Sequence, residues 1–327
     1  MQLKIMGKQH GCTRSLIAAV FALTATLSAL GSAPTTADSP LAPEPVPVER
    51  LPYIFDIAVD RADSSYLLLA TSAGLYRASM DGTAVLVSSQ RNSIWSLALN
   101  PSDPSIIYAA GVSDEGQSVG IHISRDRGHT WHRLGNAGSE LIYFRVIDVS
   151  AADPAVVYGV GYRLWASQDG GRSWKQTETS PSWVIDLAAS SLDGRTVYAA
   201  TGSGVLSSTD GGGSWRVPKG ITCRQPVTAI DSGPDGVVYA FSLCAGLLRG
   251  DERTGKWVVT NAGFDGCIVQ HLAVDPRNSA HVYAVLGGRK VLVSVDAGLT
   301  WRALGSQRAW EPDCVTNSTG YPEPNDG

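Results

Sequence analysis

An eight-residue pattern, SxDxGx(S/T)W, recurs along this chain at nearly constant spacing. It reads SRDRGHTW from Ser124, SQDGGRSW from Ser167, STDGGGSW from Ser208 and SVDAGLTW from Ser294. Two degraded copies, SMDGTAVL and DERTGKW, stand where the spacing expects them. The aspartates of the six copies are 41 to 45 residues apart and are Asp81, Asp126, Asp169, Asp210, Asp251 and Asp296. A repeat of this length, made of short apolar runs between Gly, Asp and Pro, is typical of a β-propeller.

The octet has the composition of a tight turn between two strands. A short carboxylate can accept hydrogen bonds from nearby backbone amides, which satisfies the turn locally. The glycine, Gly171 in the second copy, can take the positive φ that such a turn often needs. The final tryptophan, here Trp174, offers a large apolar surface to a neighbouring sheet. A role for these aspartates as calcium ligands or catalytic acids is the weaker alternative, because the turn itself occupies the carboxylate.

Three short apolar strands precede each octet and a fourth begins at its end. This order predicts an all-β, six-bladed propeller of four-stranded antiparallel blades. The second strand repeats a Tyr followed by small residues, as in VVYGVG from Val156 and HVYAVL from His281, with YLLLAT from Tyr66 as a first, weaker copy. Because side chains alternate across a strand, the recurring Tyr indicates one packing environment copied around a ring. The blades are expected to begin near Tyr53, Ser93, Tyr143, Trp183, Gln225 and Ile268. Residues 44–50 offer an additional outer strand.

The N-terminus reads as a secretory signal over residues 1–37. Three basic residues precede an apolar run from Leu16 to Leu30, and small residues follow it. An uncleaved membrane anchor is the alternative, although the run is shorter than the roughly 20 residues that span a bilayer. We expect a Pro-rich linker over residues 38–50, the propeller over 51–308 and a tail over 309–327. The predicted location is therefore extracytoplasmic, either secreted or in a bacterial envelope.

Charge restricts the partners of the mature chain. Removal of residues 1–37 leaves 23 Lys and Arg against 30 Asp and Glu, a net charge of about −7. An acidic surface disfavours nucleic acid and anionic membranes. We expect a monomer that binds an extracytoplasmic protein or glycan, with no membrane insertion after cleavage of the signal. No spacing of His and Cys suggests a metal site, and no cofactor is expected.

Four cysteines remain after export, an even number in a chain bound for an oxidising compartment. Cys223 and Cys267 fall in connections between blades, Cys244 in a loop within a blade, and Cys314 beyond the last strand. All four then lie on the face where propellers usually bind ligands. The preferred pairing is Cys223 with Cys244 and Cys267 with Cys314, the second of which would hold the tail to the last blade.

The octets resemble the Asp-box, or BNR repeat, of sialidases, sortilin-type receptors, two-domain xyloglucanases and photosystem II assembly factors. The resemblance covers residues 53–305 and implies a propeller whose octets lie opposite the binding face. Sialidases are six-bladed like the predicted chain, whereas the photosystem factors are understood to carry seven blades. The motif occurs in enzymes and in non-enzymes, so it leaves activity open.

A sialidase would hold its substrate with three arginines at the heads of inner strands. Only Arg145, in YFRV, stands at such a head, and its motif lacks the expected proline. Another glycosidase would need two carboxylates facing each other about 5 to 10 Å apart. Asp56, Asp186 and Asp265 are the carboxylates nearest the presumed binding face, although each is more simply a strand-end or solvated residue.

We therefore interpret the chain as an exported, non-enzymatic binding or scaffold module. The alternative is a glycoside hydrolase of sialidase-like architecture, and the sequence identifies no catalytic residue. The ligand-binding candidates are aromatic and polar residues at the heads of inner strands or in connections, many of which could simply fill gaps between blades. They are Tyr53, Trp95, Tyr143, Arg145, Trp183, Asp186, Arg224, Gln270 and His271.

Overall fold

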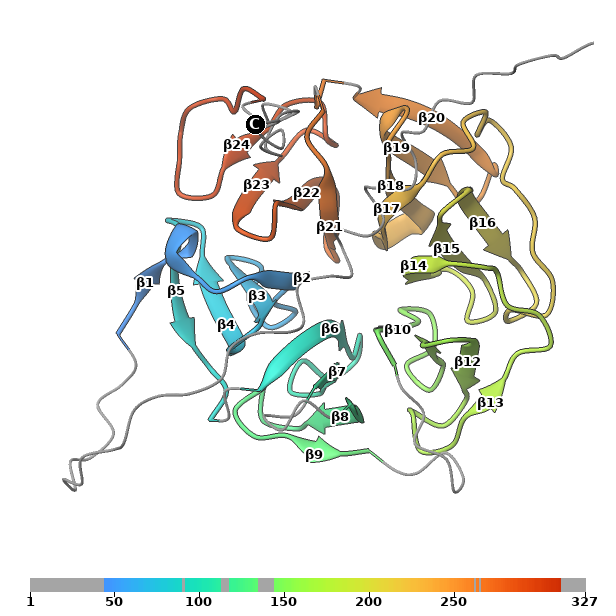
Figure 1. Cartoon of the computed structure of the whole chain (residues 1–327), viewed down its shortest axis with the longest axis horizontal. Helices are drawn as coiled ribbons and strands as arrows, with labels where there is room; N and C mark the ends of the chain where they lie inside the picture. The colour runs from blue at the N-terminus through green and yellow to red at the C-terminus, as the bar shows by residue number, and fades with distance from the viewer. Residues whose placement is uncertain are drawn as a thin grey trace, which may run out of the picture. The chain divides into compact units, whose positions relative to one another are not determined.

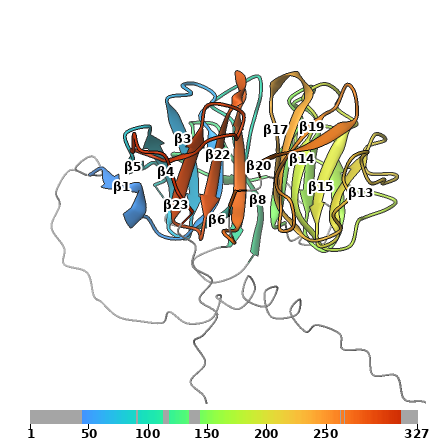
Figure 2. The ribbon, with the colours of Figure 1, turned by 90° about the horizontal axis from the view of Figure 1, so that it is seen from above.

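The computed structural model describes residues 44–89, 92–112, 118–134, 144–261, 263–264 and 266–312, all within the unit Pro43–Gly327. Six antiparallel sheets are arranged around an axis, as Figure 1 shows from one end and Figure 2 from the side. The innermost strand of each sheet contacts the innermost strand of the next, and the last contacts the first. The predicted six-bladed all-β propeller is thus confirmed. The signal segment, Tyr143, Asp265 and Cys314 lie outside the described residues.

Each blade is one sheet, numbered here in chain order from the inner strand outward. Blade 1 contains β2 (Ile54–Val59), β3 (Tyr66–Thr71), β4 (Gly74–Ser79) and β5 (Thr83–Leu86). Blade 2 contains β6 (Ser93–Leu99), β7 (Ile107–Val112), β8 (Ser118–Ser124) and β9 (His132–Arg133). Blade 3 contains β10 (Val146–Val149), β11 (Val157–Val160), β12 (Leu164–Ser167) and β13 (Lys175–Gln176).

The second half of the ring follows the same plan. Blade 4 contains β14 (Val184–Ala189), β15 (Val197–Thr201) and β16 (Gly204–Ser208), and its fourth strand is reduced to a bridge between Ser207 and Arg216. Blade 5 contains β17 (Val227–Ser232), β18 (Val237–Ser242), β19 (Gly246–Asp251) and β20 (Lys256–Asn261). Blade 6 contains β21 (Val269–Asp275), β22 (Asn278–Leu286), β23 (Lys290–Ser294) and β24 (Arg302–Ala303).

Blade 1 carries one strand more than the others. The two-residue strand β1 (Val46–Pro47) pairs with β5, and a short 3₁₀ turn, η1 (Val48–Arg50), follows it. A second 3₁₀ turn, η2 (Pro234–Gly236), joins β17 to β18. At the junction of blades 6 and 1, the Ile54 N–H donates to the Gly288 carbonyl at 2.7 Å. The ring therefore closes through contacts between whole sheets.

Buried side chains form six clusters, one between each pair of adjacent blades. The repeated tyrosine of the second strand packs toward the following blade, and its hydroxyl reaches a backbone carbonyl there. Tyr158 donates to Gly194 O at 3.1 Å, and Tyr239 to Ser279 O at 2.9 Å. The octet tryptophan packs into the junction with the preceding blade, as Trp174 does in the cluster between blades 2 and 3, where its ring centroid lies 4.8 Å from that of Phe144. Repetition of both contacts explains why the sequence repeats.

The SxDxGx(S/T)W turns join the third strand of a blade to the position of the fourth. In the copy from Ser167, the serine hydroxyl accepts the Gly171 N–H at 2.8 Å, and Asp169 accepts the Ser173 N–H at 2.8 Å. The Ser173 hydroxyl and N–H are the main causes that lower the pKa of Asp169 to about 2. The copies from Ser124, Ser208 and Ser294 repeat these bonds. These carboxylates are therefore parts of turns.

The loops define two faces of the propeller. The loop face carries the connections from one blade to the next and the loops between second and third strands. The octet face carries the octet turns and the loops between first and second strands. Disulfide-bonded Cys223 and Cys244 lie in a connection and a loop of the loop face.

Candidate functional site

A central channel is walled by the inner strands of all six blades. It encloses about 690 Å³ of empty space, which includes space open to solvent. Most of its lining residues are aliphatic, but the surface that they expose to the cavity is mostly polar, and none of the described lining residues is aromatic. Its polar lining consists of carboxylates, two serines and one arginine, which are Asp56, Asp148, Asp186, Asp231, Ser96, Ser232 and Arg61.

Each channel carboxylate bridges two neighbouring blades through backbone N–H groups. Asp148 of blade 3 accepts the N–H of Val149 at 2.8 Å with one oxygen and that of Ala189, in blade 4, at 2.6 Å with the other. The other three repeat this geometry across the junctions of blades 1 and 2, 4 and 5, and 5 and 6. Their donors are Ile57 and Leu97 to Asp56, Leu187 and Ile230 to Asp186, and Ser232 and Val274 to Asp231, at 2.7 to 3.0 Å.

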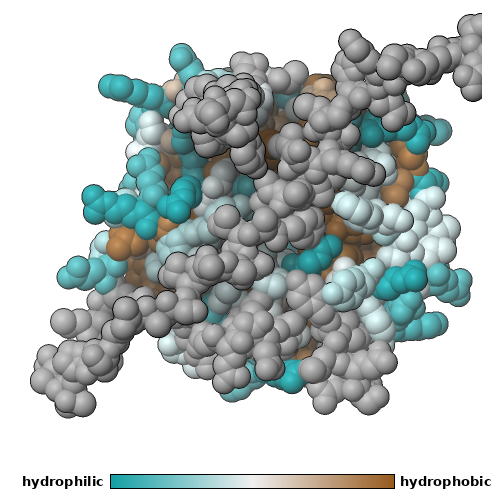
Figure 3. Space-filling model, viewed as in Figure 1, coloured by the Kyte–Doolittle hydropathy of each residue, from teal (hydrophilic) through white to brown (hydrophobic). Residues whose placement is uncertain are grey.

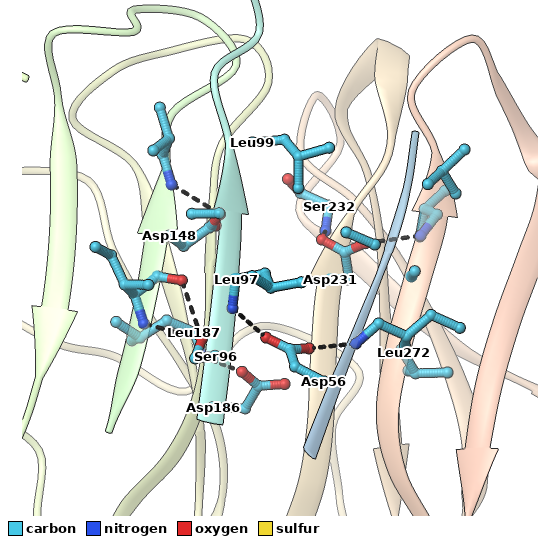
Figure 4. A pocket seen from close by; sticks show the side chains of 18 of the residues that line it. Asp56, Ser96, Leu97, Leu99, Asp148, Asp186, Leu187, Asp231, Ser232 and Leu272 are labelled. Atoms are coloured by element: carbon cyan, nitrogen blue, oxygen red, sulfur yellow. Dashed lines mark hydrogen bonds between the residues drawn. The ribbon is translucent and has the colours of Figure 1, made fainter. Parts of the chain in front are cut away.

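The carboxylates lie at two levels of the channel (Figure 4). Asp56 and Asp186 occupy equivalent positions nearer the loop face, since each follows a β-bulge in its strand. Asp148 and Asp231 lie two residues further along their strands, each opposite a tyrosine of the second strand. Ser96 takes the carboxylate position in blade 2, where its hydroxyl accepts the Ile147 N–H of blade 3 at 3.2 Å. Five of the six blade junctions are therefore joined in the same way.

Enclosure in the channel changes the acidity of these groups. Burial raises the pKa of Asp56 to about 7 and that of Asp148 to about 6, against the lowering effect of their backbone hydrogen bonds. Burial and the charge of Asp148 raise the pKa of Asp231 to about 8. Burial and the charge of Asp56 raise the pKa of Asp186 well above its usual range. Four acids that share one channel thus resist full ionisation at neutral pH.

Two cationic or titratable side chains accompany the acids. Arg61 follows the inner strand of blade 1, and its guanidinium lowers the pKa of Asp148. The Arg277 side chain donates to the Arg61 carbonyl at 2.7 Å, which helps to position Arg61. His271 of blade 6 lies with Nδ1 3.8 Å from Asp56, and burial lowers its pKa to about 4. At neutral pH His271 is therefore uncharged and does not neutralise Asp56.

The inner strands carry a β-bulge at their loop-face ends, next to the mouth of the channel. It recurs in five blades and places one extra residue at this end, namely Phe55, Trp95, Ile185, Thr228 and Gln270. Arg145 holds the corresponding place in blade 3. Some of these side chains tie adjacent blades: Arg145 Nη2 donates to Val184 O at 3.0 Å, and Gln270 Nε2 to the Tyr53 hydroxyl at 2.9 Å.

The structure separates the predicted ligand-binding residues into two groups. The first group lies at the channel or its mouth, at least partly buried and in contact with other side chains or backbone, and consists of Tyr53, Arg145, Gln270 and His271. Asp186 lies in the channel wall. Trp95 is partly buried. Trp183 and Arg224 are exposed on the loop face. Figure 3 shows hydrophobic surface in separate patches between hydrophilic side chains on one face of the propeller.

Cys223 and Cys244 form the expected disulfide, with Cα atoms 6.5 Å apart. Cys267 is also disulfide-bonded. Its predicted partner, Cys314, lies outside the described residues, so that pairing stays a prediction.

Asp148, Asp231, Ser96 and Arg61 were not among the residues predicted from the sequence. A signal for three of the channel acids was present, since Asp interrupts an apolar inner strand in VIDVS, VIDLA and AIDSG. A carboxylate inside such a run needs a partner, because an unpaired buried charge is costly. The described residues contain no group of three or more His, Cys, Asp or Glu arranged to hold a metal ion. Among them there is also no helix long and apolar enough to cross a bilayer.

Comparison with known proteins shows similarity only at the level of structure. No family model matches the sequence, and no curated protein matches it. The solved structure described as YCF48 bound to D1 peptide is 17% identical, with a TM-score of 0.51 over 84% of this chain and 90% of that one. The WD40 propeller domain of Doa1 is 13% identical, with a TM-score of 0.54 over 80% and 82%.

A GH74 xyloglucanase from Xanthomonas campestris is 17% identical, with a TM-score of 0.53 over 80% of this chain. The chain spans 46% of that enzyme's length. These likenesses show the fold. A propeller solved with a bound peptide and the propeller of a xyloglucanase both stand among the neighbours, so the fold alone leaves both functions open.

Proposed function

We propose that this chain is an exported, non-enzymatic Asp-box propeller that binds a protein or glycan partner through its loop face. The observation that supports it best is the state of the channel carboxylates. Both oxygens of each one accept backbone N–H groups from two blades, as given above for Asp148. Carboxylates held in this way act as braces, and a reacting group would have to compete with those donors for the same oxygens.

The composition of the channel wall supports the same proposal. Glycan subsites commonly use aromatic faces as apolar platforms, and none of the described lining residues is aromatic. Exposed aromatic side chains lie instead on the loop face, where Trp183 is 66% and Tyr162 93% exposed. The solved structure of YCF48 with a bound D1 peptide is an example of a similar fold that binds a peptide.

The second candidate is a glycoside hydrolase, and one observation favours it. Asp56 and Asp186 lie at the same level of the channel, and burial together with the charge of Asp56 raises the pKa of Asp186. A pair of carboxyl groups of which one stays protonated is the arrangement of a glycosidase acid and its partner. The GH74 neighbours are of this enzyme class.

Two assays separate the candidates. Purified protein is incubated with chromogenic glycosides and with xyloglucan, and a pull-down from an envelope fraction compares wild type with Trp95→Ala/Trp183→Ala. The proposal expects no turnover and a partner that is recovered by wild type only. Turnover that disappears in Asp186→Ala or Asp56→Ala would establish the hydrolase, and recovery unchanged by the double substitution would remove these tryptophans from the binding site.

A further inference from the structure

The loop face over blades 3 to 5 presents a patch of exposed aromatic, basic and aliphatic side chains. We call it the blade 3–5 patch and define it as Tyr162, Arg163, Trp183, Arg224 and Leu243. Tyr162 and Arg163 belong to the loop between β11 and β12, Trp183 directly precedes β14, Arg224 precedes β17, and Leu243 follows β18. Three blades therefore contribute to it.

Hydrogen bonds and close contacts connect these segments into one surface. Arg145 connects the segment that carries Tyr162 with the one that carries Trp183. Its N–H donates to Val160 O at 2.7 Å and its side chain to Val184 O at 3.0 Å. The Trp183 carbonyl accepts the N–H of Gly202, in the neighbouring loop of blade 4, at 3.2 Å. A Cβ at Gly204, the next glycine of that loop, would lie 3.5 Å from Cys223 O. The chain of contacts runs from blade 3 to the residue before Arg224.

The backbone of Trp183 is held in a conformation that side chains rarely adopt. Its φ is +58°, in the left-handed region, and the residue is 66% exposed. A bulky residue in this region is uncommon, and such strain gathers at functional positions where the surrounding structure fixes it. The bonds from Gly202 to the Trp183 carbonyl and from Arg145 to the next carbonyl, that of Val184, supply that fixation. The ring is thus presented to solvent by a rigid support.

The disulfide fixes the other end of the patch. Cys223 and Cys244 adjoin Arg224 and Leu243, so the bond joins the connection before β17 to the loop after β18. Rigid exposed side chains lose less conformational entropy on binding than flexible ones. The parts of the patch around Trp183 and beside the disulfide are therefore preorganised.

The charge of the patch differs from that of the chain. The segments 160–164, 180–185, 201–204, 222–226 and 243–245 contain no Asp or Glu, whereas the whole chain has a net charge of −4. Arg163 and Arg224 are exposed, and neither forms an ion pair with a described residue. Arginine fits carboxylates in a bidentate manner, and Trp, Tyr and Arg dominate the energetics of protein interfaces.

We propose that the blade 3–5 patch binds an acidic peptide segment of a partner protein. An apolar side chain of the peptide packs on Trp183 and Tyr162, and its carboxylates pair with Arg163 and Arg224. This inference rests on the proposed binding function and names the partner class and the surface. A glycan ligand, which needs no carboxylates, is the alternative that the test distinguishes.

The test uses a library of random 16-residue peptides displayed on phage and selected on the whole protein, with a neutral glycan array as a second probe. Selected peptides are synthesised with a fluorescent label, and affinities are measured by anisotropy. The test variants are Trp183→Ala and Arg224→Glu. The matched controls are Leu299→Ala and Arg195→Glu, which change exposed residues of the octet face by the same chemistry. Circular dichroism confirms that each variant folds.

The expected result is enrichment of Asp and Glu among the selected peptides, with an affinity that falls as salt rises. Trp183→Ala and Arg224→Glu each weaken binding about tenfold or more, the effect of losing a hot spot, and the controls leave it unchanged. Peptides without acidic enrichment, or binding that survives both test variants, would overturn the inference. Peptides or glycans that bind elsewhere on the loop face would overturn it and leave the proposed function standing, whereas absence of any ligand on both probes would count against the proposed function itself.

Discussion

Replacement of Asp148 by Asn should change how the stability of the propeller depends on pH. The pKa of this carboxyl is raised from 3.8 to about 6 in the folded chain, chiefly by burial. A raised folded-state pKa means that the folded form binds the proton more tightly than the unfolded form. The resulting stabilisation is present below the unfolded pKa and is lost as pH rises through the folded pKa, that is, between about 4 and 6.

The magnitude follows from the size of the shift. Two units of pKa correspond to about 3 kcal/mol, which is an upper value because water in the channel screens the charge. Asn cannot ionise, so the stability advantage of wild type over Asp148→Asn should shrink by up to about 3 kcal/mol between pH 4 and pH 6. Asp148→Asn should also be less stable than wild type at every pH, because the Asn side-chain amide can accept a hydrogen bond from only one of the two N–H groups that donate to Asp148.

Urea unfolding followed by tryptophan fluorescence at pH 4, 5, 6 and 7 gives the free energies. Arg61→Gln is the informative companion, since the Arg61 guanidinium lowers the pKa of Asp148. Without this guanidinium the pKa of Asp148 should be higher still, so the pH-dependent decline in stability should extend to higher pH. Asp169→Asn is the matched control: the pKa of Asp169 is lowered to about 2, so its contribution is lost only as pH falls below about 4. A difference between wild type and Asp148→Asn that stays constant from pH 4 to 6 would refute the reasoning.

Three other substitutions test separate parts of the account. His271→Gln should lower the free energy of unfolding most at neutral pH and progressively less as pH falls from about 6.5 toward 4, since the folded-state pKa of His271 is lowered to about 4. A loss of stability that stays constant with pH in the same urea series would contradict this. Gly250→Ala should destabilise by about 1 to 3 kcal/mol, because a Cβ there would lie 2.4 Å from the Trp257 ring, and an unchanged melting temperature would show that the ring can move aside. Cys223→Ala/Cys244→Ala should lower the free energy of unfolding by about 3 kcal/mol, because the unfolded chain is no longer constrained by a cross-link between residues 21 positions apart. Equal unfolding free energies of wild type and variant under non-reducing conditions would show that the bond contributes nothing.

Much of the fold could be predicted because its determinants are local. The octet forms its turn with hydrogen bonds inside eight residues, as between Ser167 and Gly171, and its tryptophan and the repeated tyrosine mark equivalent places in five of the six blades. The fourth strand of blade 4 could not be foreseen in its reduced form. Its sequence carries a complete octet, but residues beyond Arg216 run toward the next blade, where the Trp257 N–H donates to Lys219 O at 3.2 Å.

The candidate site was harder to predict because it depends on register between blades. Asp186 was singled out as a carboxylate near the binding face, yet its partner is the Ile230 N–H, 44 residues away. No local pattern reveals that Asp148 pairs across a junction whereas the equivalent inner residue of blade 1 is Ala58. Likewise, the sequence suggested Trp183 only as one aromatic among several, and its left-handed backbone is a property of the folded chain.

Amide hydrogen exchange in Asp186→Ala tests most directly whether the channel carboxylates hold adjacent blades together. The Ile230 amide of blade 5 should lose protection by about tenfold or more, the effect of losing one buried hydrogen bond, because its acceptor, 3.0 Å away, is gone. The Ala189 amide, which donates to Asp148 in the untouched junction of blades 3 and 4, should keep its protection. Unchanged exchange at Ile230, or equal loss at both amides, would contradict the role of these carboxylates as braces between blades.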